Sequence, residues 1–408
     1  MTSSLFKTFK ILTLKNNSRH DRKNCQNMKN VIKTVALVAA ALFAVIACNK
    51  NKTAVGADQA AQNAAQLQET TEDSVVAASG QLQGSGTAEE PFLIYTETDL
   101  REIGKTYSIK SCYRLMADIM LTGDNDDDPD NGNWMPVGGN GGFSGTFDGN
   151  GHTITGLKIN ILENFPPLMC GGLFGEIDAD AMVENLGLID VSITIGAQGI
   201  GGIAGANYGT IQNCYVTGNI GDMYVKGGIV GSNTLFATIR NCFFAGTVFH
   251  RREAMSTISG GIAGVSTGAI SNCISLAESI TEEPENSSTT ARVVGKDRIT
   301  EWIGKHVNNY GWNGTTTGPS YLYYVTVPNS DNPASADGAD LTSEELKTRA
   351  AWENAGFSFG ADSMWVWNGE NGMPGLRNQK TVVPWPAYLE NPAVAIASPY
   401  NMEETLHD

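Results

Sequence analysis

From about residue 84 onward, apolar residues come in short runs that are divided by glycine turns. Four blocks of the form Gly-Gly-aliphatic-x-Gly start 30, 26 and 33 residues apart: Gly171, Gly201, Gly227 and Gly260. An asparagine in an apolar run follows each block, and these asparagines recur at intervals of 28, 28 and 31 residues: Asn185, Asn213, Asn241 and Asn272. Two markers that keep step over four units indicate an internal repeat.

Each unit contains two short β-type runs, and the units lack the 3.6-residue period of an amphipathic helix. A single unit cannot bury its apolar side, whereas stacking pairs every strand with its counterpart one coil above, at about 4.8 Å. The repeat therefore predicts an all-β fold, a parallel right-handed β-solenoid (β-helix) with capping segments and a short C-terminal helix. We place this solenoid at residues 85–320.

Equivalent positions of the units predict columns of side chains in the solenoid. Ile211, Ile239 and Ile270 form one inward column. Period-2 alternation puts the asparagines on the same face, near a corner, where their amides bond one another. The following position holds Leu186, Cys214, Cys242 and Cys273. Because leucine also occupies this position, it requires a small apolar side chain, and free cysteine meets that requirement.

Metal binding and disulfide bonding are the two alternative roles for these cysteines. Metal binding is disfavoured because they come one per coil and not as the closely spaced pairs of zinc sites. Disulfides between coils are conceivable in an exported chain, but strand neighbours about 4.8 Å apart rarely have the required geometry. Cys112 and Cys170 lie outside the column, and their spacing fits either free thiols or a bridge.

Segments on either side of the repeats predict caps, because the open ends of a stack need cover. Residues 86–104 read as an opening strand and a short helix, and residues 113–122 as a half-buried strand. Residues 321–378 form the expected C-terminal cap, with a helix that has Thr342 as N-cap and Glu345 closing a capping box. Residues 379–408 read as an extended tail.

Two tryptophans of this cap are the candidate binding aromatics of the sequence. Trp365 and Trp367 share one face, because Val366 lies between them. We expect them to cover the end of the solenoid. The alternative is a platform on which a carbohydrate stacks.

Residues 1–47 read as a signal region for export. Lys29 and Lys33 precede the apolar run 34–47, which is too short to span a bilayer comfortably, and we expect Met28 to be the true start. The sequence Val-Ile-Ala-Cys at 45–48 resembles the lipobox of bacterial lipoproteins, in which the cysteine is lipidated. Cys48 is therefore the predicted lipidation site; an ordinary signal peptide with an incidental cysteine is the alternative. Residues 48–84 read as a flexible tether.

Charge narrows the class of partner. The chain has 27 basic and 43 acidic residues and a formal charge of −16. From Cys48 onward it has 19 basic and 42 acidic residues, a formal charge of −23. A body of this charge repels phosphate backbones, so nucleic acid is excluded as a partner.

Two acidic clusters are candidates for chemistry. Asp124, Asp126, Asp128 and Asp130 alternate along one loop, the oxygen-rich spacing that calcium favours, although the loop lacks the final glutamate of an EF-hand. A solvated turn explains them as well. Asp178, Asp180 and Glu184 lie close together and offer an acid/base pair of the kind that glycosidases use, or simply a charged outer face.

Motifs of other enzyme classes are not found in the sequence. The histidines occur without an HExxH helix, so a zinc-protease mechanism has no support. The glycines punctuate coils and form neither a nucleophile elbow nor a phosphate-binding loop. Catalysis is therefore not indicated.

The repeat motifs resemble a known family. The sequence GGIAGANYGTIQNCYVTGNI at 201–220, with its sister units, resembles the GLUG repeat, and residues 133–138 and 143–157 are similar to the lead-in segment of such proteins. The resemblance covers roughly residues 84–376. It implies an extracellular bacterial β-solenoid, often an adhesin-like lipoprotein; the repeat also occurs in the noncatalytic part of some immunoglobulin-cleaving metalloproteases. No catalytic residues transfer from it.

We therefore expect a non-catalytic, surface-exposed outer-membrane lipoprotein with an adhesive or ligand-binding role. Its expected partners are the membrane, through the N-terminal lipid, and a glycan or protein ligand. Two alternatives stay open: a structural or accessory lipoprotein of a surface assembly, and a carbohydrate-active β-helix enzyme, either a glycosidase or a polysaccharide lyase.

Overall fold

The computed structural model describes residues 81–122, 132–139, 141–161, 170–222, 224–250, 257–282, 289–297, 305–319, 325–326 and 331–390. The chain divides into two units, and all of these residues belong to the second, Gly80–Asp408. Outside the described residues lie the signal region, Cys48, residues 49–80 of the tether, the aspartates 124, 126, 128 and 130, and residues 391–408. Within the described residues, no helix is long and apolar enough to cross a membrane.

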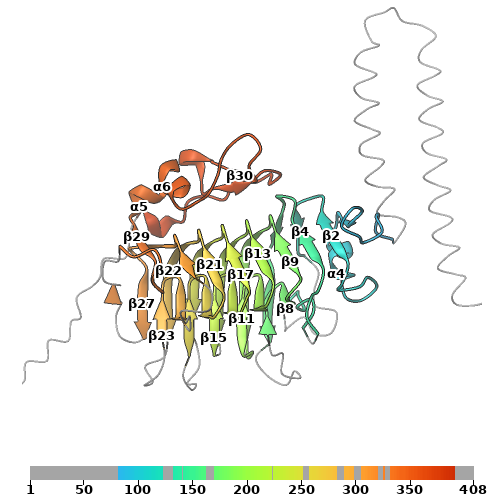
Figure 1. Cartoon of the computed structure of the whole chain (residues 1–408), viewed down its shortest axis with the longest axis horizontal. Helices are drawn as coiled ribbons and strands as arrows, with labels where there is room; N and C mark the ends of the chain where they lie inside the picture. The colour runs from blue at the N-terminus through green and yellow to red at the C-terminus, as the bar shows by residue number, and fades with distance from the viewer. Residues whose placement is uncertain are drawn as a thin grey trace, which may run out of the picture. The chain divides into compact units, whose positions relative to one another are not determined.

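Each coil of the solenoid contributes four strands, where the sequence suggested two runs. The coil at residues 199–222 consists of β11 (Gly199–Gly201), β12 (Ala204–Asn207), β13 (Thr210–Gln212) and β14 (Tyr215–Asp222). Each of them pairs in parallel with its equivalent in the next coil: β15 (Val225–Gly227), β16 (Val230–Asn233), β17 (Thr238–Arg240) and β18 (Phe243–Phe249). Figure 1 shows these strands as successive rungs. The predicted parallel β-solenoid is confirmed.

Stacking of the coils produces four parallel sheets. One of the two longest sheets runs through β1 (Phe92–Ile94), β2 (Cys112–Leu115), β4 (Thr146–Asp148), β9 (Met182–Glu184), β13, β17, β21 (Ala269–Ser271) and β25 (His306–Val307). The other runs through β3 (Ile119–Met120), β5 (Thr153–Thr155), β10 (Gly187–Ile195), β14, β18, β22 (Ile274–Glu282) and β27 (Thr316–Pro319). The shorter two run through β7 (Cys170–Gly171), β11, β15, β19 (Ile258–Gly260) and β23 (Thr289–Ala291), and through β8 (Phe174–Ile177), β12, β16, β20 (Ala263–Ser266) and β24 (Val294–Asp297). At the margins, β6 (Lys158–Ile161) pairs with β10, and β28 (Val325–Thr326) pairs antiparallel with β27.

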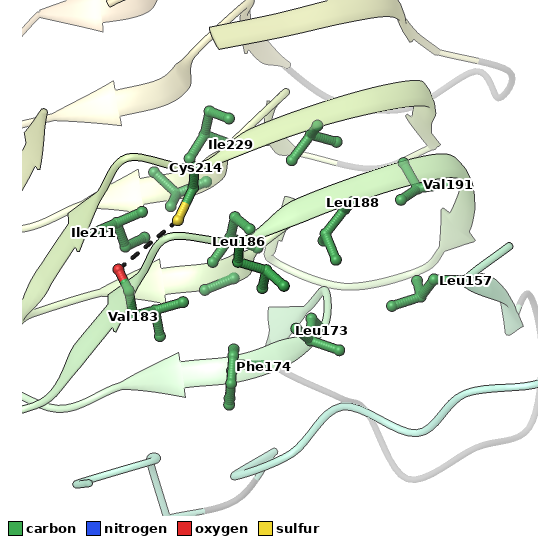
Figure 2. Close-up of a cluster of buried hydrophobic side chains, with 14 of the residues drawn as sticks. Leu157, Leu173, Phe174, Val183, Leu186, Leu188, Val191, Ile211, Cys214 and Ile229 are labelled. Carbon is green, nitrogen blue, oxygen red and sulfur yellow. Dashed lines mark hydrogen bonds between the residues drawn. The ribbon is translucent and has the colours of Figure 1, made fainter. Parts of the chain in front are cut away.

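The core consists of aliphatic columns that run through the coils. Ile211, Ile239 and Ile270 are paired in register and are fully buried. The aliphatic residue of each glycine block is also buried: Leu173, Ile203, Ile229 and Ile262. Figure 2 shows several of these side chains meeting inside the coil. Each coil thus buries the apolar side of its neighbours, as the repeat requires.

The N-terminal end matches the expected strand and helix in part. β1 is followed by α4 (Glu97–Arg101), and a capping box between Thr96 and Asp99 stabilises the start of this helix. The single strand expected at 113–122 is wrong, because β2 ends at Leu115 and β3 starts at Ile119. A polar corner separates them: Asp118 Oδ1 accepts the backbone N–H of Thr153 at 3.0 Å.

The C-terminal end of the stack is covered by residues 331–341. The Ala336 carbonyl accepts the N–H groups of Val293 and Val294, and β29 (Ala339–Leu341) pairs with β26 (Tyr310–Trp312). Arg292 occupies the position of the second glycine in the blocks. It is fully buried, and its guanidinium lies 2.7 Å from Asp340 Oδ1. In this last coil an arginine reaches the covering segment where earlier coils admit only glycine.

The segment after this cover lies along a flank of the solenoid and not across its end. It contains α5 (Ser343–Leu346), α6 (Arg349–Asn354) and the hairpin of β30 (Trp365–Val366) and β31 (Gly375–Leu376), seen above the rungs in Figure 1. The Lys380 N–H donates to Asp118 Oδ2 at 2.9 Å, so the segment runs back to the first coils. Where the sequence predicts one helix after Thr342, the structure has two, because Thr348 is the N-cap of a second helix, α6.

Candidate functional site

The repeated asparagines occupy one corner of every coil, directly after a strand and not inside it. Asn185, Asn213, Asn241 and Asn272 follow β9, β13, β17 and β21, and their φ values are 56°, 51°, 52° and 55°. Asparagine accepts this left-handed conformation more readily than other residues with a side chain, apart from aspartate. The recurrence of asparagine is therefore a requirement of the corner.

Side-chain amides connect most of these corners. Asn213 Nδ2 donates to Asn185 Oδ1 at 3.0 Å, and Asn272 Nδ2 donates to Asn241 Oδ1 at 3.3 Å. Between these two pairs, Asn241 Nδ2 donates instead to the Gly356 carbonyl at 2.8 Å. The ladder thus also fastens the C-terminal segment to the solenoid.

A second ladder lies at the end of the neighbouring sheet, and sequence reasoning missed it. Asn207 Nδ2 donates to Asn233 Oδ1 at 3.0 Å, and Asn233 Nδ2 donates to Ser266 Oγ at 3.2 Å. All three side chains are buried. Each stands six residues after the first glycine of its block, and this constant offset is the feature of the sequence from which the second ladder could have been predicted.

The cysteine column is a packing feature. Cys214, Cys242 and Cys273 are free and fully buried, and Figure 2 shows Cys214 beside Ile211 and Leu186. Burial raises the pKa of the Cys214 and Cys273 thiols, which disfavours the thiolate that a metal or an electrophile needs. Cys112 and Cys170 are free as well. In the described part of the chain, no group of three His, Cys, Asp or Glu side chains is placed to hold a metal ion.

The candidate binding tryptophans are engaged inside the molecule. Trp365 is 3% exposed, and its ring contacts Tyr215, Phe243 and Phe357. Trp367 is half-buried against Phe359 and Trp385. Trp365 thus packs the C-terminal segment against the flank of the solenoid, whereas Trp367 packs within that segment. Neither ring covers the end of the solenoid, and Trp365 is too buried to form an open platform.

A cleft of about 570 Å³ opens at the corner between the sheets of β12 and β13. It is lined by Lys110, Ser144, Glu176, Asp178, Ala179, Asp180 and Tyr208. Apart from Glu176, which lies in β8, these residues precede β2, β4, β9 and β13, which are neighbours in one sheet. The stacking of the coils is what brings residues from so far apart in the sequence to one place.

Carboxylates dominate the polar lining of this cleft. Three carboxylates and one ammonium give it a formal charge of −2. Ser144 Oγ donates to Asp178 Oδ2 at 2.5 Å. Gly142 makes room for this carboxylate, because a Cβ there would lie 2.1 Å from Asp178 Oδ1.

The acidic residues singled out in the sequence are thus separated by the fold. Asp178 and Asp180 lie in the cleft, where Glu176 joins them. Glu184 lies in β9, where Gln212 Nε2 donates to its carboxylate at 2.6 Å. The expected grouping of Glu184 with the two aspartates is therefore wrong, since the aspartates lie in the turn before β9 and Glu184 lies at the far end of that strand.

Tyr208 lines the cleft from the coil that follows the one with Glu176 and Asp178. Its side chain is 42% exposed. Partial burial and the negative charges of Glu176 and Asp178 raise the pKa of its phenol. The ring is therefore neutral at physiological pH and lies close to both carboxylates.

The next coil adds an exposed apolar tip above Tyr208. The Thr234 N–H donates to the Asn207 carbonyl at 2.9 Å, so the two turns are stacked. From Asn233 to Thr238 this turn is two residues longer than the turn from Asn207 to Thr210. Leu235 and Phe236 are the extra residues, and they are 42% and 89% exposed.

Phe236 has an unusual backbone for a bulky residue. Its φ is 69°, and every other non-glycine residue with positive φ in the described ranges is an asparagine or an aspartate. The sequence carried a signal for this insertion, because Asn241 follows the first glycine of its block by 14 residues, whereas Asn213 follows its own by 12.

Comparison with known proteins supports the repeat assignment. The family model "The GLUG motif" matches residues 196–221, which include β12, β13 and Tyr208. The chain is 32% identical over 159 residues to halomucin of Haloquadratum walsbyi, which is 38% of this chain and 2% of that protein. It is 38% identical over 137 residues to a candidate Gly-rich membrane protein of Evansella cellulosilytica, which is 33% of this chain and 15% of that protein.

Among solved structures, the chain is similar to a candidate immunoglobulin A1 protease from Bacteroides ovatus. The similarity covers 72% of this chain and 94% of that one, with a TM-score of 0.50 and 23% identity. At this identity the likeness concerns the fold alone. The motif match and the stacked coils together support the resemblance drawn from the sequence: this chain contains a GLUG motif at residues 196–221 and is built as a parallel β-solenoid.

Proposed function

We propose that this chain is a non-catalytic binding protein of the cell envelope with an adhesive role. The GLUG motif and the relatives named as halomucin and as a membrane protein support the location. The observation that carries the binding role is the exposed corner of Tyr208, Leu235 and Phe236 beside the acidic cleft. Contiguous exposed apolar side chains rimmed by polar residues are typical of interaction sites.

The test is a binding array with the purified chain. Immobilised matrix proteins and glycans are incubated with the chain, and soluble fragments are measured in the same wells. We expect saturable binding to one class of ligand and no release of fragments. Binding to neither class, or release of fragments from the ligand that binds, would overturn the proposal.

We also propose that the chain is anchored outside the cell by a lipid on Cys48. The lipobox-like sequence at 45–48 supports this anchor. Cells fed an alkyne-bearing fatty acid should label the wild-type chain and leave Cys48→Ser unlabelled, whereas equal labelling of the two would refute the anchor. Protease treatment of intact cells should cleave the chain; an uncut chain would place it inside the envelope.

A carbohydrate-active enzyme is the second candidate. It is favoured by the three carboxylates that share the cleft, since glycosidases use paired carboxyl groups. The fragment measurement in the array decides between the two functions. If fragments appear, Asp178→Asn should abolish their release.

A further inference from the structure

We propose that the corner cleft binds a basic segment of a partner protein and seats an arginine side chain between the Tyr208 ring and the carboxylates of Glu176 and Asp180. This inference rests on the proposed binding function and names the chemistry of the partner. The residues that carry it are those of the cleft and the apolar tip formed by Leu235 and Phe236.

The charge of the cleft selects a cation. Its lining has a formal charge of −2, and the chain from Cys48 onward has a formal charge of −23. Both repel phosphates, sulfates and acidic glycans and attract basic segments from a distance. Lys110 lies at the opposite end of the cleft from Tyr208. The two residues precede β2 and β13, which are three strand positions apart, about 14 Å at the usual strand spacing.

The aromatic side chains favour arginine among cations. Arginine stacks its planar guanidinium on an aromatic face while its N–H groups bond a carboxylate in pairs. Tyr208 lies directly above the strand that carries Glu176, because its N–H donates to the Ile177 carbonyl at 2.8 Å. In the register of these strands Ala206 pairs with Glu176, so Tyr208 and Glu176 are diagonal neighbours on adjacent coils, within reach of a single guanidinium.

The apolar tip extends the site beyond one side chain. Phe236 is 89% exposed and stands one coil above Tyr208. Its ring therefore has almost no contact with the solenoid itself. Aromatic residues and arginine are the side chains that contribute most to protein interfaces. The tip would contact the residues of the partner segment that flank the arginine.

The experiment titrates the full chain with a hexa-arginine peptide in a calorimeter. We expect binding whose Kd rises at least about tenfold when the salt is raised from about 50 mM to about 500 mM, because exposed charge attraction is screened. Tyr208→Ala and the double variant Glu176→Gln, Asp180→Asn should each weaken binding about tenfold or more. Phe236→Gly should weaken a longer basic peptide and leave hexa-arginine nearly unchanged.

Two controls separate the cleft from the general negative charge. Asp362→Asn and Met120→Ala change an exposed carboxylate and an exposed apolar side chain elsewhere, and both should leave Kd unchanged. No binding, equal weakening by Asp362→Asn, or displacement of the peptide by a neutral oligosaccharide at low concentration would overturn the inference. In the first and third cases, binding in the array would leave the proposed function standing.

Discussion

The corners of the solenoid depend on φ values that few side chains accept, and Asn213 tests this dependence. Asn213→Ala should lower the free energy of unfolding by about 1–3 kcal/mol, because alanine opposes the left-handed conformation and the amide bond to Asn185 is lost. Asn213→Gly keeps the backbone and should lose less. Urea unfolding measures both, and an alanine variant as stable as the wild type would contradict the reading.

The Phe236→Gly variant tests whether the strained backbone at this exposed position lowers the stability of the fold. Phe236→Gly should raise the free energy of unfolding by about 1 kcal/mol, because glycine adopts the φ of 69° without strain and the ring buries little surface. The measurement is the urea midpoint of the variant beside that of the wild type. A fall in stability would show that the ring packs against the solenoid, and would contradict the description of Phe236 as an exposed tip available to a ligand.

The buried thiols predict a loss of stability at alkaline pH. Burial raises the pKa of Cys214 and Cys273 above the unfolded value of about 8.5, while, despite its burial, hydrogen bonds with these two thiols lower the pKa of Cys242. Because two raised values oppose one lowered value, above that pH the folded column binds more protons than the unfolded chain. The free energy of unfolding should therefore fall as the pH rises from about 8 to about 10. The double variant Cys214→Ala, Cys273→Ala should show a shallower decline; an unchanged slope would count against the assignment.

Among the elements, the turn between the two strands of a glycine block depends on close approach between coils. At Gly228 a Cβ would lie 2.1 Å from Phe244 Cγ and 2.3 Å from the Gly261 carbonyl oxygen. Gly228→Ala should therefore lower the free energy of unfolding by about 1–3 kcal/mol or more. Gly360→Ala is the matched control, since the nearest atom to its Cβ is 3.5 Å away. Similar midpoints for the two variants would contradict the packing.

The elements that the sequence predicted best are those that repeat. The glycine and asparagine markers place β11 to β22 because stacking requires the same residue at the same corner in each coil. The flank cover was not foreseen, because it depends on the outer face of β14 and β18. Tyr215-Val216 and Phe243-Phe244 are apolar at successive positions, a pattern typical of strands buried on both faces. That pattern was the signal for a covering segment.

At the scale of the whole molecule, stacking creates a site that no single repeat contains. Asp178 and Asp180 could be picked from the sequence as a pair. Tyr208 and Lys110 could not, because their proximity depends on which corner each turn occupies. The cleft also lies where the repeat becomes irregular, between the lead-in coils and the two-residue insertion at Phe236. The candidate site therefore lies at departures from the repeat and not within its regular part.

If this solenoid holds a binding corner outside the cell, intact cells should adhere through that corner. Cells that lack the chain are supplied with the wild type, Tyr208→Ala or Met120→Ala, and equal surface amounts are verified by antibody. Attachment to the ligand found in the array is then counted. We expect attachment with the wild type and with Met120→Ala, and a loss of at least about tenfold with Tyr208→Ala. Equal attachment by all three strains would contradict it.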